Sequence, residues 1–147
     1  MDKDFDSIEE LMEYVKKDMV KTIHRNSDEI EDVMLTNIKQ NVYNAYEPQS
    51  YNRRWENGGL YSRDNIIVSA KPVADGVNIF IDNITQGGGW DKGARIAEII
   101  EYGVGDPEDS DTPEYAKPRP FMEPTRDDLE EYETIQHILK DNLDYIK

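Results

Sequence analysis

The sequence contains no cysteine and only two histidines among its 147 residues. Without cysteine the chain can form no disulfide, no thiolate metal site and no cysteine nucleophile. His24 and His137 fall in different helical stretches with no neighbouring histidine, so they supply no zinc ligand set. No apolar run is long enough to span a bilayer, and the acidic first residues carry no signal-peptide core. We therefore expect no membrane contact.

Basic residues are scarce: 17 lysines and arginines face 32 acidic residues, which gives a formal net charge of −15. DNA phosphates attract basic surfaces, so the chain is a poor candidate for gripping nucleic acid. A strongly acidic surface instead suits contact with basic patches on other proteins. Hydrophobic residues make up 37%, which predicts a thin core that depends partly on partners.

Catalytic and cofactor motifs are also missing. The spacing from Gly88 to Gly93 is that of a phosphate-binding loop, but Ala94 and Arg95 follow where lysine and a hydroxyl residue are needed. The acidic loop 106–114 lacks the glycine and terminal glutamate of an EF-hand. Carboxylates are so numerous that a close pair would be uninformative. We predict no catalytic residue, no cofactor, no metal site and no enzyme activity.

Two apolar stripes predict a helical segment over residues 1–47. Their members recur at three- and four-residue steps and are Ile8, Leu11, Met12, Val15 and Met19, then Ile30, Val33, Met34, Ile38, Val42 and Ala45. The stripes are in phase, which favours one long helix, although the capping residues 26–29 allow a break. Asp6 or Ser7 can cap its start, and Pro48 predicts an end near residues 46–47.

The middle of the chain predicts a contact loop followed by a hairpin. Residues 48–65 are irregular, and Asn57-Gly58-Gly59 is turn chemistry. The β-branched run 66–70 and the alternating run 77–82 predict two strands. Asp75-Gly76 supplies the turn, within a loop that Lys71-Pro72 lengthens. Because two strands alone are marginal, we expect further short strands near 84–86 and 116–121.

Two helices are expected after the hairpin. One runs from Ala94 to about Tyr102 and ends at Gly103, and the other covers residues 125–147 with Thr125 as its cap. Residues 66–124 thus hold the sheet and the short helix. The sequence predicts a single α+β domain in which a long N-terminal helix packs on a small antiparallel sheet.

One cluster combines positive charge with aromatic rings. Tyr51, Arg53, Arg54 and Trp55 are of the residue types enriched at protein interfaces, and Trp90 in the glycine-rich loop is a further candidate contact. The alternative is that Trp55 packs under its own loop while the arginines pair with Glu47 and Glu56. The sequence is compatible with both arrangements.

Three ordered stretches resemble the tail-completion, or head–tail joining, proteins of long-tailed bacteriophages. The resemblance covers most of the chain, from about residue 30 onward. The first stretch runs from Tyr46-Glu47-Pro48 through Tyr51-Asn52-Arg53-Arg54 to Gly58-Gly59-Leu60. The second runs from Arg95 to Gly103 and contains Glu101-Tyr102-Gly103, and the third is Arg119-Pro120-Phe121-Met122 with Pro124. Many relatives carry an Asp-Thr-Gly type turn where this chain has Asn57-Gly58-Gly59-Leu60. That departure leaves open whether the chain is a joining ring, a tail terminator or an adaptor.

The resemblance implies a structural role without catalytic residues. Such proteins form rings, often hexamers, at the neck that joins the tail to the filled head. The implied partners are other copies of the chain and neighbouring neck or tail proteins, in the virion and, during assembly, in the host cytoplasm. Glu101, Tyr102, Gly103, Arg119, Pro120 and Phe121 would act structurally. We expect Arg119 to pair with Glu101 and Phe121 to pack on the short helix.

Two other functions remain as alternatives. An acidic DNA-mimic inhibitor would occupy a DNA-binding protein, and the net charge fits this, although basic residues are interleaved with the acidic ones. A small hydrolase with a carboxylate site has no support beyond abundant aspartate and glutamate.

An acidic ring lumen has a physical rationale, because like charge keeps DNA from sticking as it slides.

Overall fold

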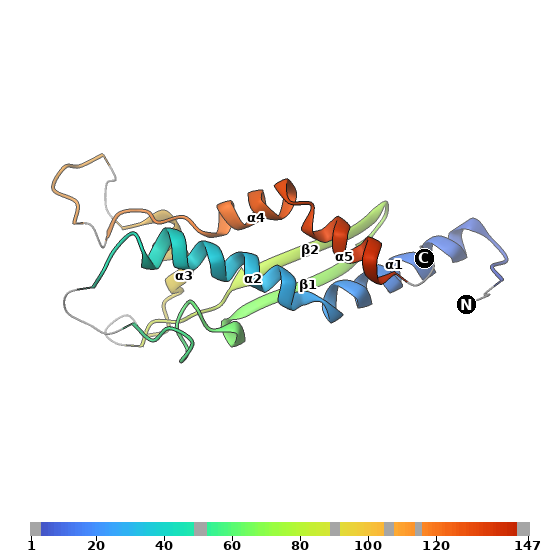
Figure 1. Cartoon of the computed structure of the whole chain (residues 1–147), viewed down its shortest axis with the longest axis horizontal. Helices are drawn as coiled ribbons and strands as arrows, with labels where there is room; N and C mark the ends of the chain where they lie inside the picture. The colour runs from blue at the N-terminus through green and yellow to red at the C-terminus, as the bar shows by residue number, and fades with distance from the viewer. Residues whose placement is uncertain (1–3, 49–52, 89–91, 105–107, 114–115, 144–147) are drawn as a thin grey trace.

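The computed structural model describes residues 4–48, 53–88, 92–104, 108–113 and 116–143. The chain begins with α1 (Ile8–Arg25), α2 (Ser27–Asn37) and a π-helical turn, η1 (Ile38–Tyr43). A 3-10 turn, η2 (Arg63–Asn65), leads into the strands β1 (Ile66–Val73) and β2 (Gly76–Asn83). The helices α3 (Ile96–Tyr102), α4 (Met122–Glu131) and α5 (Thr134–Asn142) complete the fold, which Figure 1 shows to be elongated. Tyr51, Trp90 and parts of the loops 48–65, 87–93 and 106–114 lie outside the described residues.

The N-terminal helical segment is divided at Asn26, so the expectation of one continuous helix was wrong. The side-chain amide of Asn26 donates to the Thr22 carbonyl at 2.8 Å, and its backbone N–H lies 3.2 Å from the same oxygen. Such local bonding by asparagine competes with the helical ladder. The two helices still follow one another along the long axis, and η1 ends the segment at Tyr43, a few residues before the predicted end (Figure 1).

The hairpin is tighter than predicted. Val73 pairs with Gly76, so the turn contains only Ala74 and Asp75, and Lys71-Pro72 belongs to β1 rather than to a longer loop. Within the described ranges the sheet has these two strands alone, and the further strands expected near 84–86 and 116–121 are not formed. Gln86 makes one isolated bridge, to Arg95. Helices covering one face supply the burial that a two-stranded sheet lacks.

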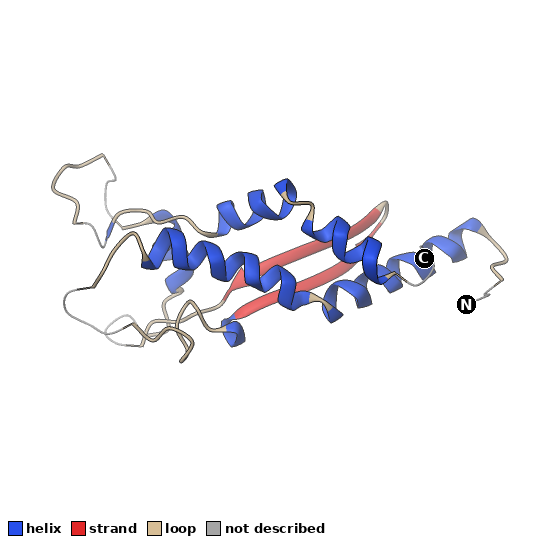
Figure 2. Cartoon of the chain, in the orientation of Figure 1, coloured by secondary structure: helices blue, strands red, loops and turns tan. Residues whose placement is uncertain are grey.

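The helices form a layer over the inner face of the hairpin (Figure 2). α1 lies against both strands, α2 contacts β1 and α4, and α5 packs on α1. This arrangement confirms the α+β class and the packing of the N-terminal helix on the sheet. The core has two clusters: Met34, Leu35, Ile38, Val42, Tyr43, Leu60, Ile66, Ala97 and Phe121 form the first, and Ile23, Ile30, Ala70, Leu129 and Ile138 form the second.

The C-terminal helical segment is also divided, contrary to the prediction of one helix capped by Thr125. α4 begins at Met122, and Thr125 is buried inside it, where its hydroxyl donates to the Phe121 carbonyl at 2.5 Å. Glu133 has a left-handed backbone (φ 50°) and separates α4 from α5. Residues 144–147, which belonged to the predicted helix, lie outside the described part of the chain.

Candidate functional site

Glu101 of α3 caps α4 from a distance in sequence of about twenty residues. One carboxylate oxygen accepts the backbone N–H groups of Phe121 and Met122 at 2.8 and 2.9 Å, and the other accepts that of Glu123 at 3.1 Å. Glu101 is 7% exposed. A buried carboxylate at the N-terminus of a helix satisfies free amides and complements the helix dipole.

The predicted structural motif therefore comes together, but with different contacts. Instead of an ion pair with Glu101, Arg119 places its guanidinium over the ring of Tyr46, 5.1 Å from the centroid. The backbone N–H of Arg119 donates to Ile100 of α3 at 2.8 Å. Phe121 is fully buried in the core cluster that contains Ala97 of α3, as the sequence predicted. Sequence reasoning missed the capping role because carboxylates are too abundant to single one out.

The other members of the motif divide between backbone and surface. Gly103 has φ 72°, and a Cβ there would lie 2.6 Å from the carbonyl oxygen of Ala116, so the position requires glycine. Pro120 is exposed, and the ring of Tyr102 is 77% exposed. Tyr102 therefore lies at the surface of the molecule and is not part of the core.

Trp55 lies in an aromatic cluster at the end of the helical layer. Its ring meets Tyr43 edge-on with centroids 4.4 Å apart, and Tyr61 lies 6.1 Å away. The backbone of Trp55 has φ 49°, a conformation rare for a bulky residue. A Cβ on Gly59 would lie 2.6 Å from the Trp55 carbonyl oxygen, so this turn needs glycine. Trp55 remains 40% exposed, which is compatible with both local packing and contact with a partner.

The two neighbouring arginines bind backbone carbonyls rather than the carboxylates of Glu47 and Glu56. Arg53 donates to the Tyr43 carbonyl at 2.8 Å and stacks 4.6 Å above the Tyr43 ring. Arg54 donates to the Gln86 carbonyl at 2.6 Å. The alternative in which the arginines pair locally is thus not what the structure shows. Both cations instead hold the 53–65 loop against the rest of the fold.

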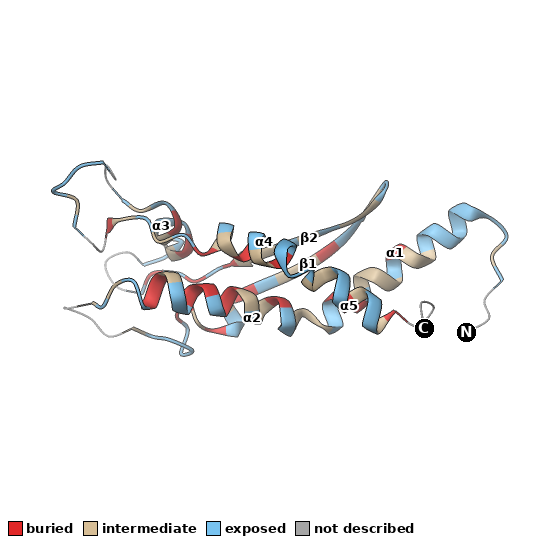
Figure 3. Ribbon diagram, turned by 45° about the horizontal axis from the view of Figure 1, so that its top comes forward, coloured by how far each residue is buried: buried red, intermediate tan, exposed pale blue. Residues whose placement is uncertain are grey.

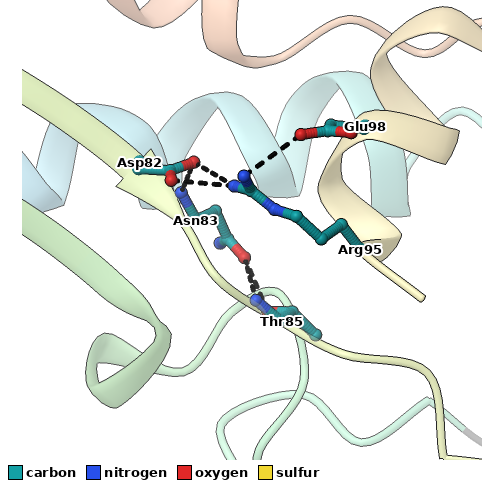
Figure 4. Close-up of polar contacts among 5 residues, drawn as sticks. All are labelled: Asp82, Asn83, Thr85, Arg95 and Glu98. Carbon is teal, nitrogen blue, oxygen red and sulfur yellow. Dashed lines mark hydrogen bonds and ion pairs between the residues drawn. The ribbon is translucent and has the colours of Figure 1, made fainter. Parts of the chain in front are cut away.

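A polar network joins this loop to the end of β2 (Figure 4). Asn83 is fully buried, donates to the Leu60 carbonyl at 2.9 Å and accepts from the backbone and hydroxyl of Thr85. Asp82 accepts two contacts from Arg95 at 2.7 and 2.8 Å, and Arg95 reaches Glu98 at 3.1 Å. The donors and acceptors satisfy one another within the network, so we interpret its role as structural.

The outer half of α1 carries apolar side chains that the described structure leaves largely or partly exposed. Ile8 is 71% exposed, Met12 47% and Leu11 41%. Figure 3 shows this half of α1 projecting beyond the rest of the molecule, with mostly exposed residues. The Ser7 hydroxyl caps the helix by accepting the Glu10 N–H at 3.1 Å. The sequence indicated this stripe, but the stripe itself does not tell whether the chain covers it.

The described residues offer little for catalysis or metal binding. No group of three or more histidine, aspartate or glutamate side chains within them is placed to hold a metal ion. One open hollow of about 650 Å³ lies beside Arg63, whose pKa is raised by hydrogen bonds to Glu31 and Asp32. A second, of about 600 Å³, lies between β2, α3 and α4. Across the same described ranges, no helix is long and apolar enough to cross a bilayer.

Comparison with known proteins gives the family. The model of the YomN family matches residues 7–145. The chain belongs to the YomN family. It is 29% identical over 140 residues to the SPbeta prophage-derived uncharacterized protein YomN of Bacillus subtilis (strain 168). The aligned region covers 92% of this chain and 91% of that relative. No solved structure gives a significant match. The YomN family therefore has a prophage-derived member, which agrees with the phage origin that the resemblance implied.

Proposed function

We propose that the protein is a non-catalytic structural component of a phage particle, which joins the tail to the head as part of a ring at the neck. The prophage origin of its YomN relative supports the phage setting. The ordered resemblance to head–tail joining proteins supports the neck role. The observation that carries the proposal is the exposed apolar stripe on the projecting half of α1.

That stripe has the properties of an assembly contact. Contiguous exposed apolar side chains on a soluble protein mark interaction sites. A helix gains most of its stability in a protein from packing of its apolar face. Ile8, Leu11 and Met12 in the outer half of α1 gain only part of this packing from the described residues, although the same helix is well packed around Ile23. A partner that covers Ile8, Leu11 and Met12 would complete the burial.

The shape of the molecule favours repetition of one contact. Figure 1 shows α1 projecting from one end of an elongated molecule while the loops lie at the other. Contact of this arm with a different surface of the next copy is heterologous, and heterologous contacts close into rings when the rotation fits. The net charge of −15 would repel the DNA that passes through such a ring.

The test is assembly of the purified protein, alone and with tails from the phage that encodes it. Light scattering and negative-stain microscopy would measure mass and shape for the native chain and for the double variant Leu11→Gln/Met12→Gln. The control is Glu9→Gln/Lys17→Gln, which changes two polar side chains of α1 and leaves the net charge unchanged. We expect the native chain and the control to form rings or cap the tails, and the apolar-stripe variant to stay unassembled.

Two results would contradict the proposal. Equal assembly of both double variants would show that the exposed stripe is not the contact. A native chain that ignores tails but forms a small, discrete complex with a DNA-binding protein would favour the DNA-mimic function instead.

A further inference from the structure

The two edges of the hairpin differ in how far they are protected from pairing with another strand. On β1, the N–H of Ala70 donates to the Nε2 atom of His24 in α1 at 3.1 Å, and Lys71 and Pro72 follow in the same strand. Lys16 of α1 donates to the Ala74 carbonyl at 2.8 Å in the turn. Lysine, proline and a covering helix are the usual means by which a sheet edge is protected from pairing. The β2 strand, Gly76–Asn83, contains neither lysine nor proline.

The backbone groups on the open edge of β2 can be identified from the register. Ala70 pairs with Ile79, yet its N–H points away from β2, towards His24. The Ala70–Ile79 pair is therefore a non-hydrogen-bonded pair, and the N–H and carbonyl of Ile79 also point outward. Because the two kinds of pair alternate, Val77 and Ile81 are oriented in the same way.

These outward groups have no partner within the described structure. No hydrogen bond from another described segment reaches the backbone of Val77, Ile79 or Ile81. Pro72 lies opposite Val77, at a position of β1 whose missing N–H would also have pointed outward. The sheet therefore accommodates proline on its protected edge and leaves the other edge with free donors and acceptors.

A groove runs beside this open edge. It has a volume of about 600 Å³, and its lining combines part of β2 with residues of α2, α3 and α4; among them are Met34, Ile79, Ile81, Tyr102, Met122 and Arg126. Phe80, also in the lining, is 56% exposed, on the outer face of β2. An added strand would place alternate side chains into this groove, which is lined by both apolar and charged residues, and the others beside Phe80.

We propose that the open edge of β2 binds an extended segment of a partner protein, in which apolar residues alternate with basic ones, as a third strand of the sheet. The apolar residues would pack with Ile79, Ile81 and Met122. The basic residues would lie on the face of Phe80, whose ring favours a cation. The net charge of −15, with Glu123 in the lining of the groove, favours a basic segment over an acidic one at this edge. The inference does not depend on the neck role.

The probe is the peptide acetyl-Lys-Val-Lys-Val-Lys-Val-Lys-amide, titrated into the isotope-labelled full chain and followed by NMR amide exchange. We expect saturable binding and at least tenfold slower exchange at Val77, Ile79 and Ile81. The amide of Ala70, already bonded to His24, serves as the internal reference and should not change. Two peptide controls keep the length: one replaces lysine by glutamate, and one carries methyl groups on the valine nitrogens.

Both control peptides should bind at least tenfold more weakly, the first because its charge is wrong and the second because its N–H donors are lost. Ile79→Pro should weaken binding of the lysine peptide to the same degree, because it removes an outward N–H and leaves the hydrogen bonds between β2 and β1 intact. The methylated peptide tests the same bond without altering the fold.

Equal binding of the methylated and unmethylated peptides would overturn the proposal, since attraction would then be electrostatic alone. Absence of binding, or slowed exchange at other residues, would overturn it as well. The free chain could already show slow exchange at these three amides, together with a measured mass that doubles as its concentration rises. In that case a second copy occupies the edge and the proposal is wrong.

Discussion

At the scale of single residues, Glu101 is the side chain on which the α3–α4 junction most depends. Glu101→Ala would leave three backbone amides of the first turn of α4 without this partner, that of Phe121 buried and the other two partly buried, and we expect it to lower the free energy of unfolding by about 3 kcal/mol. The control is Glu98→Ala, also on α3, whose side chain is 55% exposed and pairs with Arg95. That change should cost under about 1 kcal/mol. Urea denaturation measures both, and equal losses would refute the capping role.

Gly103 and Gly58 offer a matched pair of backbone tests. Both have positive φ, 72° and 81°, but only at Gly103 would a Cβ meet a neighbouring carbonyl, at 2.6 Å. Gly58→Ala should cost about 1 kcal/mol for the backbone conformation alone. Gly103→Ala should cost about 3 kcal/mol, because a clash adds to the same strain. Thermal denaturation of the two variants compares them, and a Gly103 variant as stable as the Gly58 variant would contradict the close approach.

At this scale the sequence predicts which residues matter better than what they touch. Gly103 was expected to end a helix in the left-handed helical conformation. It does end α3 with a positive φ of 72°, but its ψ of −178° is not that of a left-handed helix. Glu101 and Arg119 were expected to pair because both belong to the motif that resembles the head–tail joining proteins. In the structure Glu101 instead accepts hydrogen bonds from backbone N–H groups. Every residue except proline carries such a group, so no sequence pattern singles them out.

At the scale of elements, two glycine substitutions near the junction between α4 and α5 are expected to change stability in opposite directions. Glu133 is exposed and held at φ 50°, so Glu133→Gly should relieve strain and stabilise the chain by about 0.5 kcal/mol. Glu130→Gly, in the last turn of α4, should destabilise it by about 1 kcal/mol. Thermal denaturation gives the sign directly, and a loss of stability in both variants would mean that the two helices are not divided at Glu133.

The element pattern was predictable where it depends on local periodicity and failed where it depends on packing. The apolar stripes gave the N-terminal helices, and the alternation of residues 77–82 gave β2. The apolar phase favours one continuous helix across Asn26, because the phase carries no information on the hydrogen bond from the Asn26 side chain to the Thr22 carbonyl. The further strands were expected because a hairpin needs cover, and α1 and α2 provide that cover instead.

At the scale of the whole molecule, charge repulsion opposes the folded state. The Debye length falls from about 30 Å at 0.01 M salt to about 10 Å at 0.1 M, which screens repulsion across the surface. With a net charge of −15, we therefore expect the melting temperature to rise by several degrees over that range. Sodium and potassium chloride should act equally if screening is the cause. A melting temperature that stays constant or falls would show that local ion pairs outweigh the net charge.

The candidate surfaces show the limit of sequence reasoning at this scale. The Trp55 cluster was found from residue types alone, and the structure divides it between local packing and 40% exposure. The exposed half of α1 and the open edge of β2 were not foreseen as surfaces, because a stripe or an alternating strand looks the same whether or not the chain covers it. The geometry of the whole fold decides which apolar faces remain free.

The central claim, that this member of the YomN family is a structural part of a phage neck, is tested most directly by locating it in the particle. An epitope placed after Lys147, detected by gold labelling and electron microscopy of purified virions, would give the position. We predict label at the junction between head and tail in complete particles. Virions that carry no label, with the protein recovered only from the soluble fraction of infected cells, would contradict the account.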